Sequence, residues 1–247
     1  MNLFSEIQEP ILPFSIPKEA GYSAEWDEEL KGFKIRLPHG ELFYSEHFFN
    51  EKISDRSIEY FLENTSNDWR TNDWKSLTGD ELKSVNFKNI KWKQDSINFY
   101  GKTSLLPRIT SWYGDHGKSY SYSGINSNPN KWNKGLLHIK KGIEGVAGVT
   151  FNSVLMNWYR DGEDYLSWHS DNEKELGLNP TIASVNFGAE RDFILRMNDE
   201  PIKITIPLGH GSLLLMSGEL QKYWQHSVPK RKKVKDMRIN LTFRIIN

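Results

Sequence analysis

The sequence contains no cysteine among its 247 residues. This absence excludes disulfides, thiolate zinc sites, iron–sulfur clusters and a cysteine nucleophile, and it fits a reducing compartment. The sequence also lacks any apolar run near the about 18 residues that a membrane span needs. Residues 1–9 have neither a basic start nor an apolar stretch, so we expect no secretory signal. We therefore expect no membrane contact and an intracellular location, cytoplasmic if bacterial and nuclear if eukaryotic.

Aromatic residues make up 13% of the chain and charged residues 26%, a composition that excludes a disordered protein. The length fits one large domain, or a domain with an N-terminal elaboration. The net charge of zero hides an asymmetry, because residues 1–50 hold nine acidic and four basic side chains. The densest basic cluster has five cations within residues 230–235. Such a cluster is either a solvated loop or a surface that contacts phosphates.

The first half of the chain shows weak periodicity. The first 30 residues are rich in proline and glutamate and read as irregular. Weak alternation on either side of residues 38–40 predicts a short hairpin. Apolar residues at helical spacing predict a helix over residues 55–62, and the polar residues 64–90 predict a loop with one helical turn.

From about residue 92 the chain consists of short β-prone segments separated by Gly, Asn or Pro. Their spacing of roughly ten residues is typical of an all-β sandwich or barrel. The expected strands are residues 151–159, 181–187, 193–197, 202–206, 212–216, 223–228 and 238–246.

His169 and Asp171 are candidate metal ligands. On an extended segment, residues two apart point to the same side, so their imidazole and carboxylate groups can meet. His226 follows on another β-prone segment. Two histidines and one carboxylate form the facial triad of non-haem ferrous sites. The alternative for this common spacing is a surface hydrogen bond between a histidine and a carboxylate.

Residues 238–244 predict a strand with alternating faces. Arg238, Asn240, Thr242 and Arg244 share one face. Two arginines on an inward face would need anions, and a dicarboxylate that spans them is the obvious ligand. The alternative is an edge strand with its polar face in solvent.

Together these features form one ordered pattern: His-x-Asp, about fifty residues, His, about a dozen residues, then Arg-x5-Arg. Further motifs between Tyr100 and Asn247 are Gly101-Lys102, Pro107-Arg108, Tyr113-Gly114-Asp115, Tyr120-Ser121-Tyr122-Ser123-Gly124, Asn157-Trp158-Tyr159, Trp168-His169-Ser170-Asp171-Asn172-Glu173, Ile182-Ala183-Ser184, Phe187-Gly188-Ala189, His210-Gly211-Ser212-Leu213 and Trp224-Gln225-His226. In this pattern the chain resembles AlkB-type Fe(II)/2-oxoglutarate-dependent dioxygenases, and most closely the branch that repairs alkylated bases in DNA.

The resemblance implies a mainly β fold with a double-stranded β-helix, or jelly-roll, core. The core would be residues 146–247, preceded by an α/β nucleotide-recognition lid at 41–145 and an irregular N-terminal extension at 1–40. His169, Asp171 and His226 would bind Fe(II) and form the catalytic centre, with O2 as the oxidant. The implied 2-oxoglutarate-binding residues are Asn157, Tyr159, Arg238, Thr242 and Arg244, with one arginine at each carboxylate.

The resemblance also implies a base flipped out of the nucleic acid, since the buried iron cannot be reached from within a duplex. Tyr122 and His169 would sandwich the base, and Tyr100 would fill the space that it leaves. Asn172 would face the base edge, where repair enzymes of this type commonly carry Asp, so the ranking of lesions stays open. The implied substrate-binding residues are Tyr100, Gly101, Lys102, Tyr120, Ser121, Tyr122 and Asn172.

The expected function is oxidative demethylation of N-alkylated bases in DNA, such as 1-methyladenine and 3-methylcytosine, by a monomer that releases formaldehyde and succinate. Two alternatives remain: an RNA demethylase that uses the same chemistry, and a catalytically silent β-barrel that binds nucleic acid.

Overall fold

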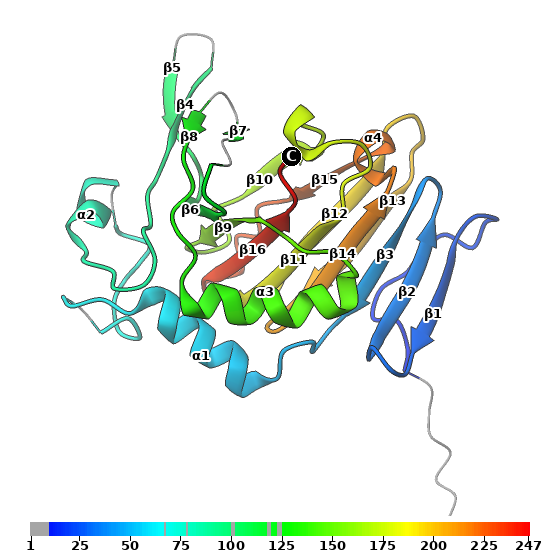
Figure 1. Ribbon diagram of the computed structural model, residues 1–247, viewed down its shortest axis with the longest axis horizontal. Helices are drawn as coiled ribbons and strands as arrows, with labels where there is room; N and C mark the ends of the chain where they lie inside the picture. Colours follow the sequence, from blue (N-terminus) through cyan, green and yellow to red (C-terminus); the bar gives the residue numbers. More distant parts are fainter. Residues whose placement is uncertain (1–9, 67, 78, 100–101, 118–119, 123–124) are drawn as a thin grey trace, which may run out of the picture.

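Two antiparallel sheets dominate the computed structural model, which describes residues 10–247 except 67, 78, 100–101, 118–119 and 123–124 (Figure 1). The larger sheet has eight strands in the order β1-β2-β3-β14-β11-β16-β9-β6. They span β1 Ser23–Asp27, β2 Gly32–Leu37, β3 Gly40–Ser45, β6 Ile109–Gly114, β9 Ser153–Tyr159, β11 Ile182–Gly188, β14 Leu213–Gly218 and β16 Arg238–Arg244.

The smaller sheet has four strands in the order β10-β15-β12-β13. They span β10 Leu166–His169, β12 Arg191–Met197, β13 Lys203–Leu208 and β15 Trp224–Val228. Two further hairpins pair β4 Ser96–Phe99 with β5 Lys102–Leu105 and β7 Tyr120–Tyr122 with β8 Ile125–Ser127.

The two longest helices, α1 and α3, each begin at an asparagine cap. The helical elements are α1 Glu51–Leu62, α2 Gly79–Ser84, α3 Lys134–Ala147, α4 Leu220–Tyr223 and the 3-10 turn η1 Lys174–Leu176. The side chain of Asn50 accepts a hydrogen bond from the backbone N–H of Ile53 at the start of α1, and Asn133 caps α3 in the same way. α3 ends at Gly148, whose φ of 65° is a left-handed conformation that glycine adopts without strain.

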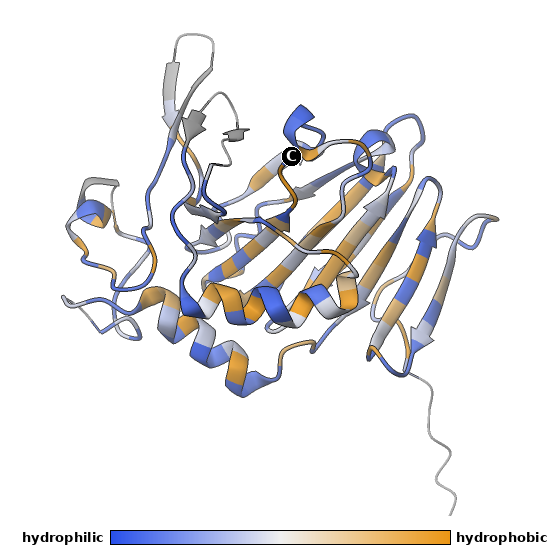
Figure 2. Ribbon diagram, in the orientation of Figure 1, coloured by the Kyte–Doolittle hydropathy of each residue, from blue (hydrophilic) through white to orange (hydrophobic). Residues whose placement is uncertain are grey.

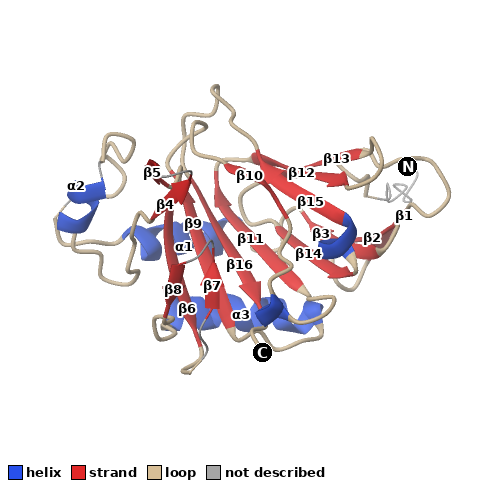
Figure 3. Ribbon diagram, turned by 90° about the horizontal axis from the view of Figure 1, so that it is seen from above, coloured by secondary structure: helices blue, strands red, loops and turns tan. Residues whose placement is uncertain are grey.

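The elements form three layers, because the strands of the larger sheet alternate their side chains between two cores. Ile239, Leu241 and Phe243 of β16 lie in the core under α1 and α3, and Figure 2 shows this alternation of hydropathy along the strands. The opposite face is covered by the smaller sheet, which lies across the larger sheet from the helices in Figure 3. The polar side chains of β16 therefore point into the space between the two sheets.

The structure confirms the mainly β fold and most of the expected elements. The hairpin appears as β2 and β3, the helix as α1, and the seven expected strands as β9, β11, β12, β13, β14, β15 and β16.

Two expectations are wrong. The first 30 residues were expected to be irregular, yet β1 lies within them and pairs with β2 at the edge of the larger sheet. The segment after residue 92 was expected to hold only β-prone pieces, but α3 lies within it. The division of the chain at residues 40 and 145 stays a prediction, and β3 and β6 of the expected lid region are strands of the larger sheet.

Candidate active site

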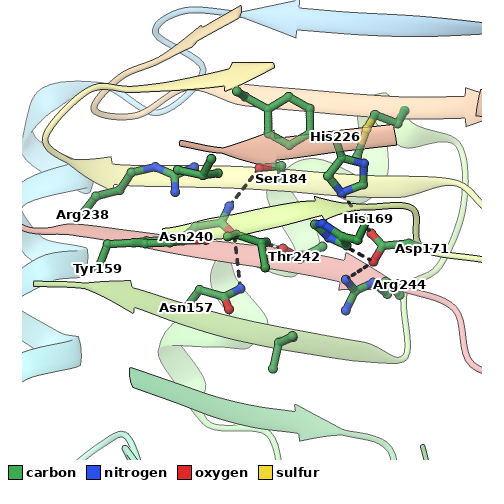
Figure 4. A pocket seen from close by; sticks show the side chains of 15 residues that line it. Asn157, Tyr159, His169, Asp171, Ser184, His226, Arg238, Asn240, Thr242 and Arg244 are labelled. Carbon is green, nitrogen blue, oxygen red and sulfur yellow. Dashed lines mark hydrogen bonds and ion pairs between the residues drawn. The ribbon is translucent and has the colours of Figure 1, made fainter. Parts of the chain in front are cut away.

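The interior strand β16 carries a row of polar side chains into a cavity between the sheets (Figure 4). Its register pairs Arg238 with Tyr159 and Asn240 with Asn157 of β9, so both strands contribute to the same wall. Arg238 is 2% exposed and Arg244 is 5% exposed. The shared face expected from the alternation is therefore buried, as an inward face requires. The lining side chains are Leu155, Asn157, Tyr159, Leu166, His169, Asp171, Ser184, Phe193, Met216, His226, Val228, Arg238, Asn240, Thr242 and Arg244.

One end of the cavity holds His169, Asp171 and His226. The pairing of β10 with β15 sets His169 opposite His226, and Asp171 follows β10 by two residues. Potential ligand atoms of the three side chains all lie within 4.8 Å of one another. The Nε2 atoms of both histidines are 3.9 Å from carboxylate oxygens of Asp171. This donor set, with two imidazoles and one carboxylate, suits a divalent transition metal such as Fe(II).

Asp171 is held in its ionised form. Burial raises the pKa of its carboxyl group, but the positive charge of Arg244 lowers it by more, so the net shift is downward. Arg244 Nη2 donates a hydrogen bond of 2.7 Å to Asp171 Oδ1. The carboxylate is thus ready to bind a cation without first losing a proton.

His226 is held neutral. Burial, followed by the nearby charge of His169, lowers the pKa of its imidazole to about 3. A neutral imidazole keeps a lone pair for metal coordination. The side chain of His169 is 21% exposed, whereas that of Asp171 is 1% exposed, so the cluster is open to solvent on the His169 side.

The other end of the cavity holds Arg238. Its Nη2 donates a 2.6 Å hydrogen bond to Asn186 Oδ1, and its guanidinium lies 5.0 Å from the ring centre of Tyr159. Burial lowers the pKa of Arg238 to about 10, so it is charged at neutral pH. Its Nε and Nη1 are buried and have no hydrogen-bond partner among the described residues. Unpaired buried donors of this kind are suited to bind a carboxylate.

The cavity therefore has two polar ends joined by apolar and amide-bearing walls. A dicarboxylate fits it chemically, with one carboxylate beside the His–Asp–His cluster and the other at the unpaired donors of Arg238. Asn157 donates to Asn240 Oδ1 at 3.4 Å, and Thr242 Oγ1 donates to the same atom at 3.0 Å. These contacts fix the wall between the two ends.

Three buried residues of the site were not expected from the sequence. Arg108 Nε donates to Asn157 Oδ1 at 2.9 Å, Asn186 accepts from Arg238, and Gln221 Oε1 accepts the backbone N–H of Asp171 at 2.9 Å. Arg108 belongs to one of the matched motifs, so a signal existed for it. Gln221 lies 50 residues from Asp171, and no local pattern could have indicated that contact.

Most of the expected substrate-binding side chains lie outside the described part of the structure. Tyr100 and Gly101 lie outside the described residues, as do the side chains of Lys102, Tyr120, Ser121 and Tyr122. Their roles stay predictions. Asn172 is described and exposed next to the buried Asp171.

The basic cluster lies in the loop between β15 and β16, which ends at Arg238. No helix among the described residues has the length and apolar character to cross a membrane.

Comparison with known families assigns this chain to a superfamily of oxygenases. Residues 41–244 match the 2OG-Fe(II) oxygenase superfamily. The chain belongs to this superfamily, whose metal, cosubstrate and oxidant are Fe(II), 2-oxoglutarate and O2. The His169, Asp171 and His226 cluster fits the metal, and the donors of Arg238 fit the cosubstrate.

Individual curated relatives show which members of the superfamily this chain is similar to. The chain is 44% identical over 158 residues to DNA oxidative demethylase ALKBH2 of Homo sapiens, which covers 61% of this chain and 60% of that protein. It is 43% identical over 169 residues to alpha-ketoglutarate-dependent dioxygenase alkB homolog 3 of Bos taurus, covering 64% of this chain and 58% of that protein. The matches thus span about three fifths of the length of these curated relatives.

A solved structure described as that of OsALKBH1 is similar in fold. It has a TM-score of 0.53 at 13% sequence identity, and the similarity covers 90% of this chain and 100% of that one. At this identity the likeness concerns the fold alone.

Proposed function

We propose that this protein oxidatively removes N-alkyl groups, such as those of 1-methyladenine and 3-methylcytosine, from bases in DNA. The observation that carries the proposal is the two-ended buried cavity, with a His–Asp–His cluster at one end and an arginine with unpaired donors at the other. The relatives named as DNA oxidative demethylases support DNA as the substrate.

Each end of the cavity has its own role. His169, Asp171 and His226 would hold Fe(II), and Arg238 would bind the far carboxylate of 2-oxoglutarate beside Tyr159. Fe(II) with bound 2-oxoglutarate and O2 would supply the oxidation: one oxygen atom would enter succinate, formed with loss of CO2, and the other would leave with the N-methyl carbon as formaldehyde. The near carboxylate would lie next to Arg244, with Asn157 and Thr242 along the wall.

The protein side of the reaction is positioning and exclusion of water. Apolar side chains, including Phe193 and Met216, line the cavity between its polar ends. Such walls keep the bound cosubstrate dry and strengthen its contacts with charged groups. The open side of the cluster, next to His169 and the exposed Asn172, is where we place the alkylated base. A cationic base stacked on an aromatic ring gains cation–π attraction.

The test is release of formaldehyde and succinate from methylated oligonucleotides in the presence of Fe(II) and 2-oxoglutarate. Single- and double-stranded DNA and RNA would each carry 1-methyladenine or 3-methylcytosine, and Asp171→Asn is the inactive control. Release from DNA supports the proposal. Release from RNA alone would favour the RNA demethylase, and binding of DNA without release would favour the silent β-barrel.

We further propose that the protein acts as a monomer inside the cell, in the compartment that holds its DNA: the cytoplasm of a bacterium or the nucleus of a eukaryote. Light scattering after size-exclusion chromatography tests the first part, since a monomer has a mass of 28.8 kDa.

A further inference from the structure

A buried arginine outside the cavity joins two surface loops. Arg191, the first residue of β12, is 2% exposed. Its guanidinium donates to the backbone oxygens of Asp161 at 2.9 Å, Asp164 at 2.9 Å and Pro229 at 2.7 Å. The first two belong to the loop of residues 160–165 between β9 and β10, here called the β9–β10 loop.

Pro229 begins the loop of residues 229–237 between β15 and β16, here called the basic loop. The two loops also bond directly, since Arg231 N donates to Gly162 O at 2.7 Å and Gly162 N donates to Val234 O at 3.0 Å. A Cβ atom on Gly162 would lie 1.8 Å from Arg231 O, so only glycine allows this approach. The basic loop is therefore docked on the β9–β10 loop rather than free in solvent.

The same arginine contacts the wall of the cavity. Tyr159, the last residue of β9, is 1% exposed, and two guanidinium groups lie over its ring. The Cζ atom of Arg191 is 5.7 Å from the ring centre, and that of Arg238 is 5.0 Å from it. Cations over an aromatic face are attracted to it, more strongly where water is excluded. A chain of buried contacts thus runs from Arg238 through Tyr159 to Arg191 and both loops.

We propose that Arg191 is a positioning residue that couples the basic loop to the Arg238 end of the cavity. A ligand that fixes Arg238 also restrains Tyr159 and Arg191, and the carbonyl contacts of Arg191 pass that restraint to both loops. A buried guanidinium cannot shift without breaking hydrogen bonds that no water would replace. The inference rests on the proposed function in one respect, the binding of 2-oxoglutarate at Arg238.

The rate of trypsin cleavage measures how often the basic loop opens, because trypsin cleaves after lysine and arginine and both Lys232 and Lys233 are exposed. Cleavage of a docked loop requires local opening, so its rate follows the population of the open form. With Mn²⁺ in place of Fe(II), 2-oxoglutarate should slow cleavage at these sites at least about fivefold, the lower range of measured couplings between sites. Mass spectrometry of the fragments identifies the cleaved bonds.

The decisive variant is Arg191→Lys, which keeps the charge but lacks the planar fork needed to reach three carbonyls on two loops. It should cleave at the same rate with and without 2-oxoglutarate. Asp192→Asn is the contrasting variant, because it removes only the ion pair between Asp192 and the side chain of Arg231. Its loop should cleave faster, yet 2-oxoglutarate should slow it by the wild-type factor. Arg196→Met, on the same strand, should behave as wild type.

Calorimetric titration with 2-oxoglutarate distinguishes a failure of the proposed function from a failure of the proposed coupling. Absence of binding to the wild type would count against the proposed function. Binding that leaves wild-type cleavage unchanged, or that slows Arg191→Lys as much as wild type, overturns the coupling alone. If Arg191→Lys does not fold, Gly162→Ala replaces it, because its Cβ would separate the loops and leave Arg191 beside Tyr159. Loss of the 2-oxoglutarate effect in that variant supports the coupling, and retention overturns it.

Discussion

Asp171 lies between the two histidines of the metal-binding cluster and the buried Arg244. Asp171→Ala removes a metal ligand and also the carboxylate that the buried Arg244 contacts at 2.7 Å. Breaking a buried ion pair by removing one partner costs about 3–5 kcal/mol. We therefore expect Asp171→Ala to lose metal binding and about 3 kcal/mol of unfolding free energy in urea. His169→Ala, the matched control, should lose metal binding with a much smaller loss of stability. Equal stability of the two variants would contradict this role of Arg244.

His226 makes the metal-free protein sensitive to acid. Its pKa is about 3 in the folded state, against an ordinary value of 6.5. Since the folded-state pKa is depressed, the neutral form stabilises the fold fully above about pH 6.5, and this contribution is lost as the pH falls toward 3. One proton changes stability by about 1.4 kcal/mol per pH unit, so wild type should lose about 2 kcal/mol between pH 7 and 5 that His226→Gln does not lose. Urea unfolding at both pH values measures the difference, and parallel losses in the two proteins would refute it.

Among the helices, α3 has three glycines, and two of them have opposite surroundings. A Cβ atom on Gly135 would lie 2.5 Å from the ring of Tyr60, whereas one on Gly145 would meet nothing within 4 Å. Alanine has a higher helix propensity than glycine by about 0.8–1.0 kcal/mol. Gly145→Ala should therefore raise the unfolding free energy by up to about 1 kcal/mol, and Gly135→Ala should lower it. Chemical denaturation of the pair tests this, and stabilisation by both changes would show that Tyr60 moves freely.

The charges of the basic loop lead to a separate prediction about how tightly the protein binds nucleic acid. Lys230 is paired with Glu163 and Arg231 with Asp192, while Lys232 and Lys233 are exposed and form no ion pair with the described residues. If these two lysines contact phosphates, replacing both with Ser should weaken duplex binding for every sequence. It should also reduce the log–log salt slope by up to about two units.

Fluorescence anisotropy at several salt concentrations measures that slope. The control replaces Lys52 and Lys134, which lie on α1 and α3 on the opposite side of the larger sheet. An unchanged salt slope in the variant of Lys232 and Lys233 would mean that these two lysines are solvated and contact no phosphates.

Strands in which apolar and polar residues alternate strongly could be predicted from the sequence, whereas elements with a weak pattern of apolar residues could not. Along β16 apolar and polar residues alternate at every position, which defined both its faces. α3 has Leu136, Ile139 and Ile143 at helical spacing and Asn133 as its cap, but its three glycines favoured a non-helical interpretation. β1 is an edge strand with largely exposed side chains, so its sequence carries almost no alternation. The contacts of Arg191 join segments remote in sequence and leave no local trace.

At the scale of the whole molecule, the cavity joins the two sheets. Its metal ligands come from the smaller sheet and the segment after β10, while Arg238 comes from the larger sheet. Metal and 2-oxoglutarate bound together should therefore stabilise the entire domain. At 100 times the dissociation constant the gain is about 2.7 kcal/mol.

Differential scanning fluorimetry with Mn²⁺ and 2-oxoglutarate tests this gain. The melting temperature should rise in the wild type and stay unchanged in Asp171→Asn, whose amide cannot replace the charged ligand. A rise of equal size in both would place the bound ligand elsewhere.

The position of β16 has a consequence for synthesis. This strand lies in the interior of the larger sheet, between β11 and β9, yet it is made after every other strand of that sheet. Translation proceeds at about 5–20 residues per second, so the ribosome releases β9 several seconds before its neighbour exists. Until β16 is made, the larger sheet remains two separate groups of strands, and chaperones can bind their unpaired edges. A nascent chain that stalls before residue 238 also lacks both Arg238 and Arg244, so its cavity would be missing the buried arginine at each end.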